Sequence, residues 1–281
     1  MNHIVCFSGG KDSTALVLWA QENLPEFTAV FCDTGWEHPI TYAYVEEINQ
    51  QLLGGKLVRV KSEDYPNGFV QLCIERKGIP STKRRFCTQE LKVYPLHAYF
   101  ESLQDEITSY QGIRANESIS RAAMTEEQWV DDAGGYWIKR PLLRWNVEQV
   151  FDIHRKYAVK PNPLYLMGSS RVGCWPCIMT GLGELKRLLV NTPEIRQRVI
   201  DLEKTVTDAN PVSETRKWPR TFFKAGTIPA RYCSISGLNE KGEMAYVPTA
   251  EDVFRYIESV DEDQLPLLPA RSCMSVYNLC E

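Results

Sequence analysis

The feature that most constrains the fold is a pair of glycines between an apolar, strand-like run and a helix-like run. Residues 4–7 are apolar, and residues 13–18 continue with helix-forming types. Glycine lets the backbone approach a ligand without a Cβ, and the N–H groups of such a turn and helix start attract anions. We therefore predict a site for nucleotide phosphates at the end of the first strand. Its expected residues are Ser8, Gly9, Gly10, Lys11, Asp12 and Ser13.

The spacing of this loop differs from that of the Walker loop, which has four residues between its glycines. The string Ser-Gly-Gly-Lys-Asp-Ser resembles the signature of the PP-loop ATP pyrophosphatases. The resemblance implies that ATP is cleaved between its α- and β-phosphates and that the loop holds the pyrophosphate part. From the residues alone, a glycine-rich strand-to-helix turn with a solvated lysine and aspartate remains the alternative.

The order of apolar runs predicts an α/β fold. Short β-rich runs occupy residues 27–32, 57–60 and 107–110, and residues 40–53 have helical spacing between the first two. Strands alternating with helices indicate a mostly parallel sheet covered on both faces, with ligands at the C-terminal strand ends. We expect a PP-loop nucleotide-binding domain over residues 1–178. Residues 179–281 would form a helical and irregular extension that completes the site.

The remaining segments give a coarser prediction. The acidic stretch before Gly134 and Gly135 indicates a surface loop, and Asn146 is a suitable cap for the helix that follows it. His154 on that helix is expected to be a packing residue. The expected elements are a loop over 125–136, a strand over 137–142, and helices over 146–157, 252–260 and both sides of Thr192-Pro193 within 180–209.

Asp33 and Thr34 follow the second predicted strand and therefore lie at the same sheet edge as the glycine loop. A carboxylate there suits Mg²⁺ beside a triphosphate, because this ion prefers hard oxygen ligands. Capping of the next helix is the equal alternative. The string from Asp33 to Pro39 also resembles one in the phosphoadenosine phosphosulfate (PAPS) reductase branch of the PP-loop superfamily, which implies that both residues line a nucleotide.

The segment after the run 107–110 resembles a second motif of the same branch. In that branch its arginines reach nucleotide phosphates, and the planar guanidinium suits bidentate phosphate contact. Taken alone, a glutamate and an arginine four residues apart form an ordinary helix ion pair. The residues that the resemblance places at the nucleotide are Gly112, Arg114, Glu117 and Arg121.

Nine cysteines are present, an odd number, and the chain begins directly with the first predicted strand. We therefore expect no signal peptide, a cytoplasmic location and no disulfide framework. Cys174 and Cys177 form a Cys-x-x-Cys pair. Two such thiolates can share a metal centre, form a redox dithiol, or belong to a zinc knuckle.

This segment is similar to the cluster-binding segment of adenylyl-sulfate reductases. With Cys87, the resemblance implies three ligands of a 4Fe–4S cluster; zinc is the fallback. Those reductases carry a tandem cysteine pair, whereas Thr88 stands at the second position here. The fourth iron would therefore be open or would use another cysteine. The candidates are Cys233, Cys273 and Cys280, and the last two form a pair in the C-terminal tail.

The formal net charge of -4 argues against a generally basic nucleic-acid-binding surface but not against a local patch. Cations cluster at residues 186–198 and, interleaved with aromatic residues, at 216–231. They could contact a nucleic acid, or they could be a solvated face and aromatic anchors of an irregular segment. No apolar run approaches the ~20 residues of a membrane span, so no membrane contact is expected.

Together with the resemblance to the PP-loop superfamily, these features predict an ATP pyrophosphatase that adenylates a substrate for sulfur transfer. The substrate could be a nucleic acid, as in enzymes of DNA phosphorothioation or RNA thiolation. Lys11, Asp12 and Asp33 would be catalytic, with ATP, Mg²⁺ and an iron–sulfur cluster as cofactors. An adenylyl-sulfate or PAPS reductase is the alternative, and a nucleotide-binding module with structural zinc is a third. A sulfur- or electron-donor protein and a homo-oligomer are the expected partners.

Overall fold

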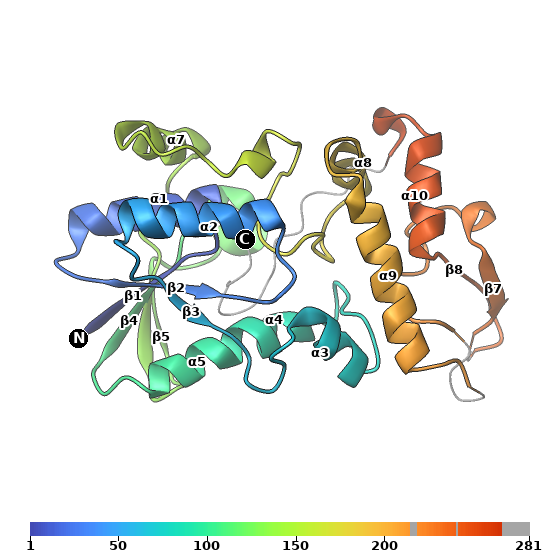
Figure 1. The fold of residues 1–281 in the computed structure, drawn as a ribbon, viewed down its shortest axis with the longest axis horizontal. Coiled ribbons are helices and arrows are strands. Elements are labelled where there is room, and N and C mark those ends of the chain that lie inside the picture. Colours follow the sequence, from blue (N-terminus) through green and yellow to red (C-terminus); the bar gives the residue numbers. More distant parts are fainter. Residues whose placement is uncertain (214–217, 240, 266–281) are drawn as a thin grey trace.

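A computed structural model describes residues 1–213, 218–239 and 241–265. An α/β sheet domain forms one side of the molecule, and a group of helices with a small hairpin forms the other (Figure 1). The sheet strands are β1 (Asn2–Cys6), β2 (Thr28–Cys32), β3 (Val58–Val60), β4 (Ile107–Tyr110), β5 (Glu127–Val130) and β6 (Tyr136–Lys139). The hairpin consists of β7 (Ile235–Leu238) and β8 (Met244–Val247).

The six-stranded sheet has the order β3-β2-β1-β4-β6-β5 and is parallel except for β5. The chain builds outward from β1 through β2 to β3 and then crosses to the other side of β1 to form β4. The connection that follows β1 therefore runs toward β2, whereas the connection that follows β4 runs toward the opposite edge of the sheet. In open α/β sheets a crevice forms at such a point, outside the carboxyl ends of the strands.

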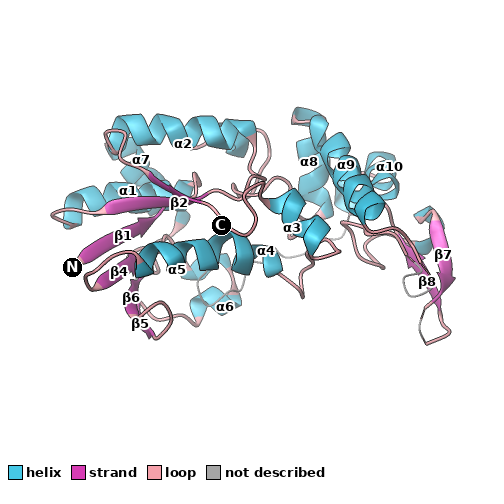
Figure 2. Cartoon of the chain, turned by 60° about the horizontal axis from the view of Figure 1, so that its bottom comes forward, coloured by secondary structure: helices cyan, strands magenta, loops and turns pink. Residues whose placement is uncertain are grey.

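Helices cover both faces of the sheet (Figures 1 and 2). The side chain of Val5 lies in the core on one face of the sheet and that of Ile4 in the core on the other face, as expected for alternating side chains on a strand. One face carries α1 (Lys11–Asn23), α2 (Pro39–Leu52) and α7 (Val147–Lys156). On the other side lie α3 (Phe69–Glu75), α4 (Phe86–Thr88), the π-helical turn η1 (Gln89–Val93) and α5 (Tyr94–Glu101). The predicted PP-loop α/β fold is confirmed.

The expectation of a surface loop over residues 125–136 was wrong. Residues Glu127–Val130 form β5, which pairs antiparallel with β6, and Gly134 and Gly135 form the connecting turn with φ of +82° and +88°. Val130 is buried while Trp129 is exposed and packs edge-on against Trp137. This alternation, rather than the acidic composition, determines the structure. The expected strand over 137–142 is shifted, because β6 ends at Lys139.

Three helices dominate the C-terminal group: α8 (Leu182–Asn191), α9 (Glu194–Ala209) and α10 (Ala250–Ser259). The division at Thr192-Pro193 is as expected, and α10 begins with a Thr249 cap that accepts from the Asp252 N–H. The short elements are α6 (Ile119–Ala122) and the 3₁₀ turns η2 (Ala115–Glu117), η3 (Pro163–Tyr165), η4 (Ala230–Tyr232) and η5 (Glu262–Gln264).

One apolar cluster joins the two groups of elements. It contains Trp36, Phe69 and Leu91 from the sheet domain together with Val199 and Phe254 from the C-terminal helices. The predicted division at residue 178 therefore crosses a shared core, and its status as a domain boundary stays a prediction. Phe222 and Phe223 are buried in the same cluster, which agrees with an anchoring role for the aromatic residues of the irregular segment.

The cations over residues 186–198 of α8 and α9 pack within the C-terminal helices or against the site instead of forming a free basic surface. Each contacts a carboxylate, a carbonyl oxygen or an aromatic ring, so they give no support to the nucleic-acid alternative. The contacts are Lys186 with Ile257 and Val260, Arg187 with Glu262, Arg196 with Glu251 and Glu258, and Arg198 with Trp36 and Trp175. Within the described part of the chain, no helix is long and apolar enough to cross a membrane.

Candidate nucleotide and cysteine site

The glycine loop connects the end of β1 to the start of α1 and is closed by one serine. Gly9 has φ +79°, a conformation that side chains rarely adopt, and a Cβ there would lie 2.9 Å from Val45. The hydroxyl oxygen of Ser13 accepts hydrogen bonds from the N–H groups of Ser8 and Gly10, each at 3.2 Å. Ser13 thus folds the loop back on the first turn of α1, which begins at Lys11, two residues before the predicted start.

The expectation of free loop N–H groups needs correction. Ser13 takes the N–H groups of Ser8 and Gly10, and the N–H of Lys11 donates to the Tyr165 hydroxyl at 3.0 Å. Closing a tight loop against a buried helix start requires these donors to be satisfied, because an unpaired buried N–H is costly. Phosphate oxygens at this loop would therefore meet hydroxyl groups and side-chain charges as well as backbone amides.

A second layer holds the loop from behind. His154 Nε2 lies 2.8 Å from the carbonyl oxygen of Lys11, and Asn162 donates to the carbonyl of Gly9 at 3.1 Å. His154 and Asn162 are 2% and 0% exposed, so water does not compete for these bonds. His154 is thus the packing residue that the sequence indicated, and its contact is with the loop itself.

The charged residues at the start of α1 form a buried network. The Asp12 carboxylate is fully buried and pairs with both Lys11 and Arg114. Gly112 makes this pairing feasible, because a Cβ at this position would lie 2.9 Å from the Asp12 carbonyl oxygen. The structure therefore brings Lys11, Asp12, Gly112 and Arg114 together, with Arg114 bound to a carboxylate.

Glu117 and Arg121 pair with each other. Arg121 is completely buried, and its guanidinium contacts the Glu117 carboxylate, which also accepts from the N–H of Arg114 at 3.1 Å. The ion pair that the residues alone suggested is therefore present, but it joins two short elements, η2 and α6, on either side of the extended Ser118. It fixes the turn that carries Arg114 beside the glycine loop, whereas the role of both arginines at phosphates stays a prediction.

Asp33 and Glu37 share one phenol at the end of β2. The Tyr42 hydroxyl lies 2.7 Å from Asp33 Oδ1 and 2.8 Å from Glu37 Oε2. Asp33 also accepts from the Gly35 N–H and pairs with Lys61 at 3.0 Å. Burial acts to raise the pKa of Asp33, but the bonds from Tyr42, Gly35 and Lys61 outweigh it and lower this pKa below its ordinary value. Asp33 is thus held ionised, with both carboxylate oxygens engaged.

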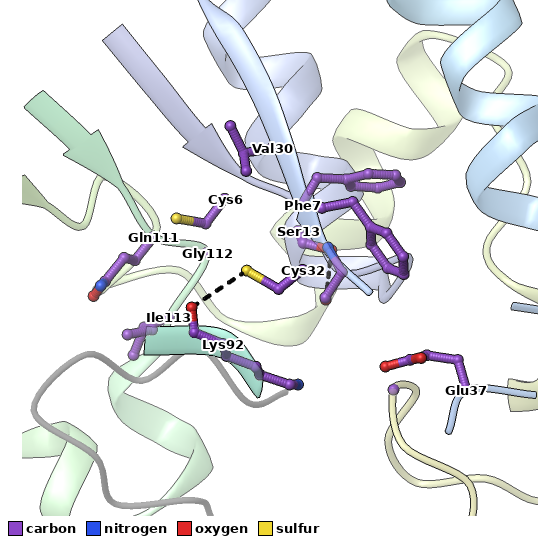
Figure 3. Close-up of a pocket in the computed structure, with 13 residues that line it drawn as sticks. Cys6, Phe7, Ser13, Val30, Cys32, Glu37, Lys92, Gln111, Gly112 and Ile113 are labelled. Carbon is purple, nitrogen blue, oxygen red and sulfur yellow. Dashed lines mark hydrogen bonds between the residues drawn. The ribbon is translucent and has the colours of Figure 1, made fainter. Parts of the chain in front are cut away.

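A pocket lies at the C-terminal ends of β1, β2 and β4, where the connections diverge (Figure 3). We name it the strand-end pocket. The residues that line it are Cys6, Phe7, Ser8, Ser13, Val30, Phe31, Cys32, Glu37, Lys92, Gln111, Gly112, Ile113 and Gly173. Burial raises the pKa of the Cys6 thiol to about 11, so this thiol stays protonated in the pocket wall.

A second pocket contains the three cysteines that the sequence connects with a cluster. We name it the cysteine pocket. The residues that line it are Thr34, Trp36, Phe69, Arg85, Cys87, Thr88, Leu91, Lys92, Cys174, Pro176, Cys177, Ile178 and Met179. The Cys174 sulfur lies 3.8 Å from the Thr34 hydroxyl oxygen. Cys87, Cys174 and Cys177 are therefore gathered in space, as the resemblance implies, although Cys87 is far away in sequence.

The two pockets adjoin. Lys92 lines both of them, and the neighbours Gly173 and Cys174 line one each. Thr34 lines the cysteine pocket and donates to Glu37 of the strand-end pocket at 2.6 Å. Asp33 does not appear among the described residues that line either pocket.

Of the fourth-ligand candidates, the structure describes Cys233, which does not line the cysteine pocket. Cys233 lies at the end of η4, where its sulfur is 3.9 Å from the Pro229 carbonyl oxygen, and burial raises the pKa of its thiol. Cys273 and Cys280 lie outside the described residues. Over residues 1–213, 218–239 and 241–265, no group of three or more His, Cys, Asp or Glu side chains is arranged to hold one metal ion.

Residues 2–180 match the phosphoadenosine phosphosulfate reductase domain. This match covers well over half of the 281 residues and contains the glycine loop, the segment at Gly112 and all three cysteines of the cysteine pocket. The chain belongs to the phosphoadenosine phosphosulfate reductase domain family. The predicted family is therefore confirmed.

Relatives of this PAPS reductase-domain chain span phages and bacteria. An uncharacterized 37.8 kDa protein of Escherichia phage 186 is 34% identical over 282 residues, which cover 82% of this chain and 81% of the relative. The phosphoadenosine 5'-phosphosulfate reductase of Erwinia tasmaniensis is 24% identical over 150 residues, or 53% of this chain and 59% of the relative. A crystal structure of PAPS reductase from Candida auris in a phosphate complex matches the fold, with TM-score 0.50, 20% identity, and coverage of 63% of this chain and 83% of that one.

Several residues of this PAPS reductase-domain site were not predicted from the sequence. Glu37 stands within the string from Asp33 to Pro39, and Lys92 follows the predicted cluster ligand Cys87 by five residues, so this proximity was the available signal. Asn162 and Tyr165 support the glycine loop from more than 150 residues away. Their signal was weak, because a short turn sequence does not show which backbone it will contact.

Proposed function

We propose that this protein binds an adenine nucleotide in the strand-end pocket and uses it to activate a substrate for sulfur transfer at the cysteine pocket. ATP would be cleaved between its α- and β-phosphates. The observation that supports this most directly is the shared wall of the two pockets, formed by Lys92 and by Gly173 next to Cys174. A substrate activated in one pocket would lie close to the thiols of the other.

The chain's own residues would bind and orient the nucleotide. The hydroxyls of Ser8 and Ser13 lie 3.0 Å apart and, with the Lys11 and Lys92 side chains, would surround the phosphates. A substrate oxygen would attack the α-phosphorus to form an adenylate, and pyrophosphate would leave. Positive side chains fixed beforehand stabilise charge that develops on such a leaving group. The Asp12 carboxylate would hold Lys11 in place through their ion pair.

Mg²⁺ usually binds to one or two carboxylates together with substrate phosphates. Both carboxylates accept hydrogen bonds on both oxygens, but Glu37 lines the strand-end pocket, whereas Asp33 lines neither pocket and pairs with Lys61. We therefore propose Glu37 as the carboxylate nearer to such an ion. Asp33 would act indirectly, because its hydrogen bond holds the Tyr42 hydroxyl between the Asp33 and Glu37 carboxylates.

Cys87, Cys174 and Cys177 fit an iron–sulfur cluster better than one zinc ion. A 4Fe–4S cluster takes one thiolate per iron, so its ligands surround a larger group. The three thiols line one mostly apolar pocket. When bound, the cluster would supply an iron able to carry sulfide or electrons. Cys273 and Cys280 remain candidates for the fourth iron.

A PAPS or adenylyl-sulfate reductase is the second candidate function. It is favoured by the relatives named phosphoadenosine 5'-phosphosulfate reductase, from Erwinia tasmaniensis and Proteus mirabilis. Against it, a buried threonine, Thr88, stands where the tandem second cysteine was expected.

The two functions differ in their products. The purified protein would be incubated with Mg²⁺ and ATP labelled at the α-phosphate, and separately with PAPS and reduced thioredoxin. AMP or adenylated product together with pyrophosphate supports the first function. Sulfite from PAPS without pyrophosphate from ATP would replace it with the second. Iron and acid-labile sulfide analysis tests the cluster independently, and a protein containing only zinc contradicts it.

The acceptor and the partners follow from the same proposal. Lys83 and Arg84 are exposed beside Arg85, which lines the cysteine pocket, so a polyanionic acceptor such as a nucleic acid fits this side. Thiolation of an added oligonucleotide, read by mass spectrometry, tests that acceptor. A donor protein would supply sulfur or electrons, and light scattering tests the proposed homo-oligomer.

A further inference from the structure

Arg198 of α9 lies between two tryptophans of the site. Its guanidinium carbon is 3.9 Å from the ring centroid of Trp36 and 5.6 Å from that of Trp175. Trp36 follows β2, and Trp175 stands inside the Cys-x-x-Cys pair. A planar guanidinium stacks on the face of an aromatic ring, and this attraction grows when the cation is partly desolvated. One side chain of the C-terminal group thus touches both segments that build the pockets.

The two tryptophan segments are also joined by their backbones. The Trp175 N–H donates to the Trp36 carbonyl at 2.8 Å, and the Trp36 indole N–H donates to the Pro176 carbonyl at 3.1 Å. Glu37 and Cys174 form an antiparallel bridge beside them. Glu37 lines the strand-end pocket, and Cys174 lines the cysteine pocket. The spacing between the pockets therefore depends on how Trp36 and Trp175 pack.

Arg198 is bound differently from Arg196, the nearest cation on its helix. Burial lowers the pKa of Arg198, and the nearby Glu37 carboxylate acts in the opposite direction. Its Nε has no hydrogen-bond acceptor among the described residues. Arg196, two residues earlier, instead forms ion pairs with Glu251 and Glu258 of α10. Arg196 stabilises the helical group, whereas Arg198 faces the site.

We propose that Arg198 is a positioning residue that packs Trp36 and Trp175 together and thereby fixes Glu37 relative to Cys174. Helix α9 is then part of the functional site, because it sets the geometry between nucleotide and thiols. The inference rests on the proposed function, in that both pockets take part in one reaction. It goes beyond that function by assigning a role to a residue outside the matched family domain.

The test compares Arg198→Leu with Arg198→Lys and with the control Arg196→Leu on the same helix. All are studied as the full chain with whatever metal it carries. Hydrogen exchange is measured on peptides containing residues 36–37 and 174–178, and pyrophosphate or sulfite formation is measured in parallel. We expect faster exchange of the Trp175 amide in Arg198→Leu, and turnover lower by roughly 100-fold, since a shift of about 1 Å between reacting groups costs this much. Nucleotide Kd measured without Mg²⁺ should change little, because Arg198 contacts Trp36 and Trp175 and not residues 8–13.

Arg198→Lys should show nearly the same exchange and turnover as Arg198→Leu, because an ammonium group keeps the charge but cannot stack on the tryptophan rings as a planar guanidinium does. Arg196→Leu should lower the melting temperature without changing exchange at either peptide. Equal exchange in Arg198→Leu and wild type, or equal effects of both leucine variants, would overturn the positioning role. If the wild type forms neither product, the proposed function fails, and the exchange data still decide whether Arg198 holds the two segments.

Discussion

Gly112 brings the chain after β4 into backbone contact with the start of α1. A Cβ there would lie 2.9 Å from the Asp12 carbonyl oxygen and 3.2 Å from the Ser13 Cα, and neither backbone atom can move alone. We expect Gly112→Ala to destabilise the protein by about 1–3 kcal/mol through overpacking and to weaken nucleotide binding. Urea unfolding and nucleotide titration measure the two effects.

The matched control for this substitution is Gly183→Ala. Position 183 lies in α8, where the atoms nearest to an added Cβ are ends of flexible side chains at 3.8 Å or more. Alanine should be neutral there or stabilise the helix by roughly 0.5–1 kcal/mol. Unchanged nucleotide affinity in Gly112→Ala would show that the close approach does not support the loop.

Asp33 contributes a pH-dependent stabilisation. Hydrogen bonds from Tyr42, Gly35 and Lys61 outweigh burial and lower its pKa. A carboxyl group with a depressed folded-state pKa stabilises the protein above its unfolded pKa, and this stabilisation is lost as pH falls through the folded value. We expect Asp33→Asn to cost about 1–3 kcal/mol at pH 7, with the difference from wild type shrinking in acid. Urea unfolding from pH 7 to pH 3 checks this, and a constant difference would contradict it.

Helix α9 is tied to two other segments through one buried carboxyl group. Glu203 accepts from the Phe222 N–H at 2.7 Å and from the Ala250 N–H at 2.8 Å, using a different oxygen for each. Burial raises its pKa from 4.5 to about 7. Since the folded-state pKa is raised, this group favours folding most below the unfolded value, and stability should fall as pH rises from 4.5 to about 7.

The variant Glu203→Gln tests this arrangement. It should remove this part of the pH dependence and cost about 1–3 kcal/mol, because the amide NH₂ would face one of the two backbone N–H donors. Urea unfolding of both proteins at pH 5 and pH 8 gives the free energy of unfolding, and from it the destabilisation and the change of stability with pH. A variant with the wild-type slope of stability against pH would rule out Glu203 as its source.

The whole molecule should unfold as one unit. The cluster containing Leu202 also contains Trp36, Phe69 and Leu91 of the sheet domain. Leu202 is 2% exposed, so Leu202→Ala should cost about 2–5 kcal/mol. The loss should appear equally in far-ultraviolet circular dichroism and in tryptophan fluorescence, because one core serves both parts. Two separate transitions would indicate that residues 1–178 fold independently.

Much of the element order followed from local signals. Val5 and Ile4 alternate between the two cores, and the Asn146 cap begins α7 as expected. Residues 125–136 were misassigned because their charges hid a period-two alternation ending at Val130. The shared core around Leu202 could not be predicted either, since periodicity shows which face of a helix is apolar but not which element packs against that face.

The sequence alone determined the family, the α/β order and the identity of the glycine loop, because these depend on contiguous residues and their spacing. It also placed Cys87 with Cys174 and Cys177, but only through resemblance. Tertiary structure decided what each charge contacts: Arg114 binds Asp12, Glu37 rather than Asp33 lines the pocket, and Arg198 reaches Trp36. Some of these contacts join residues more than 150 positions apart in the sequence, and only the packed fold specifies which residues meet.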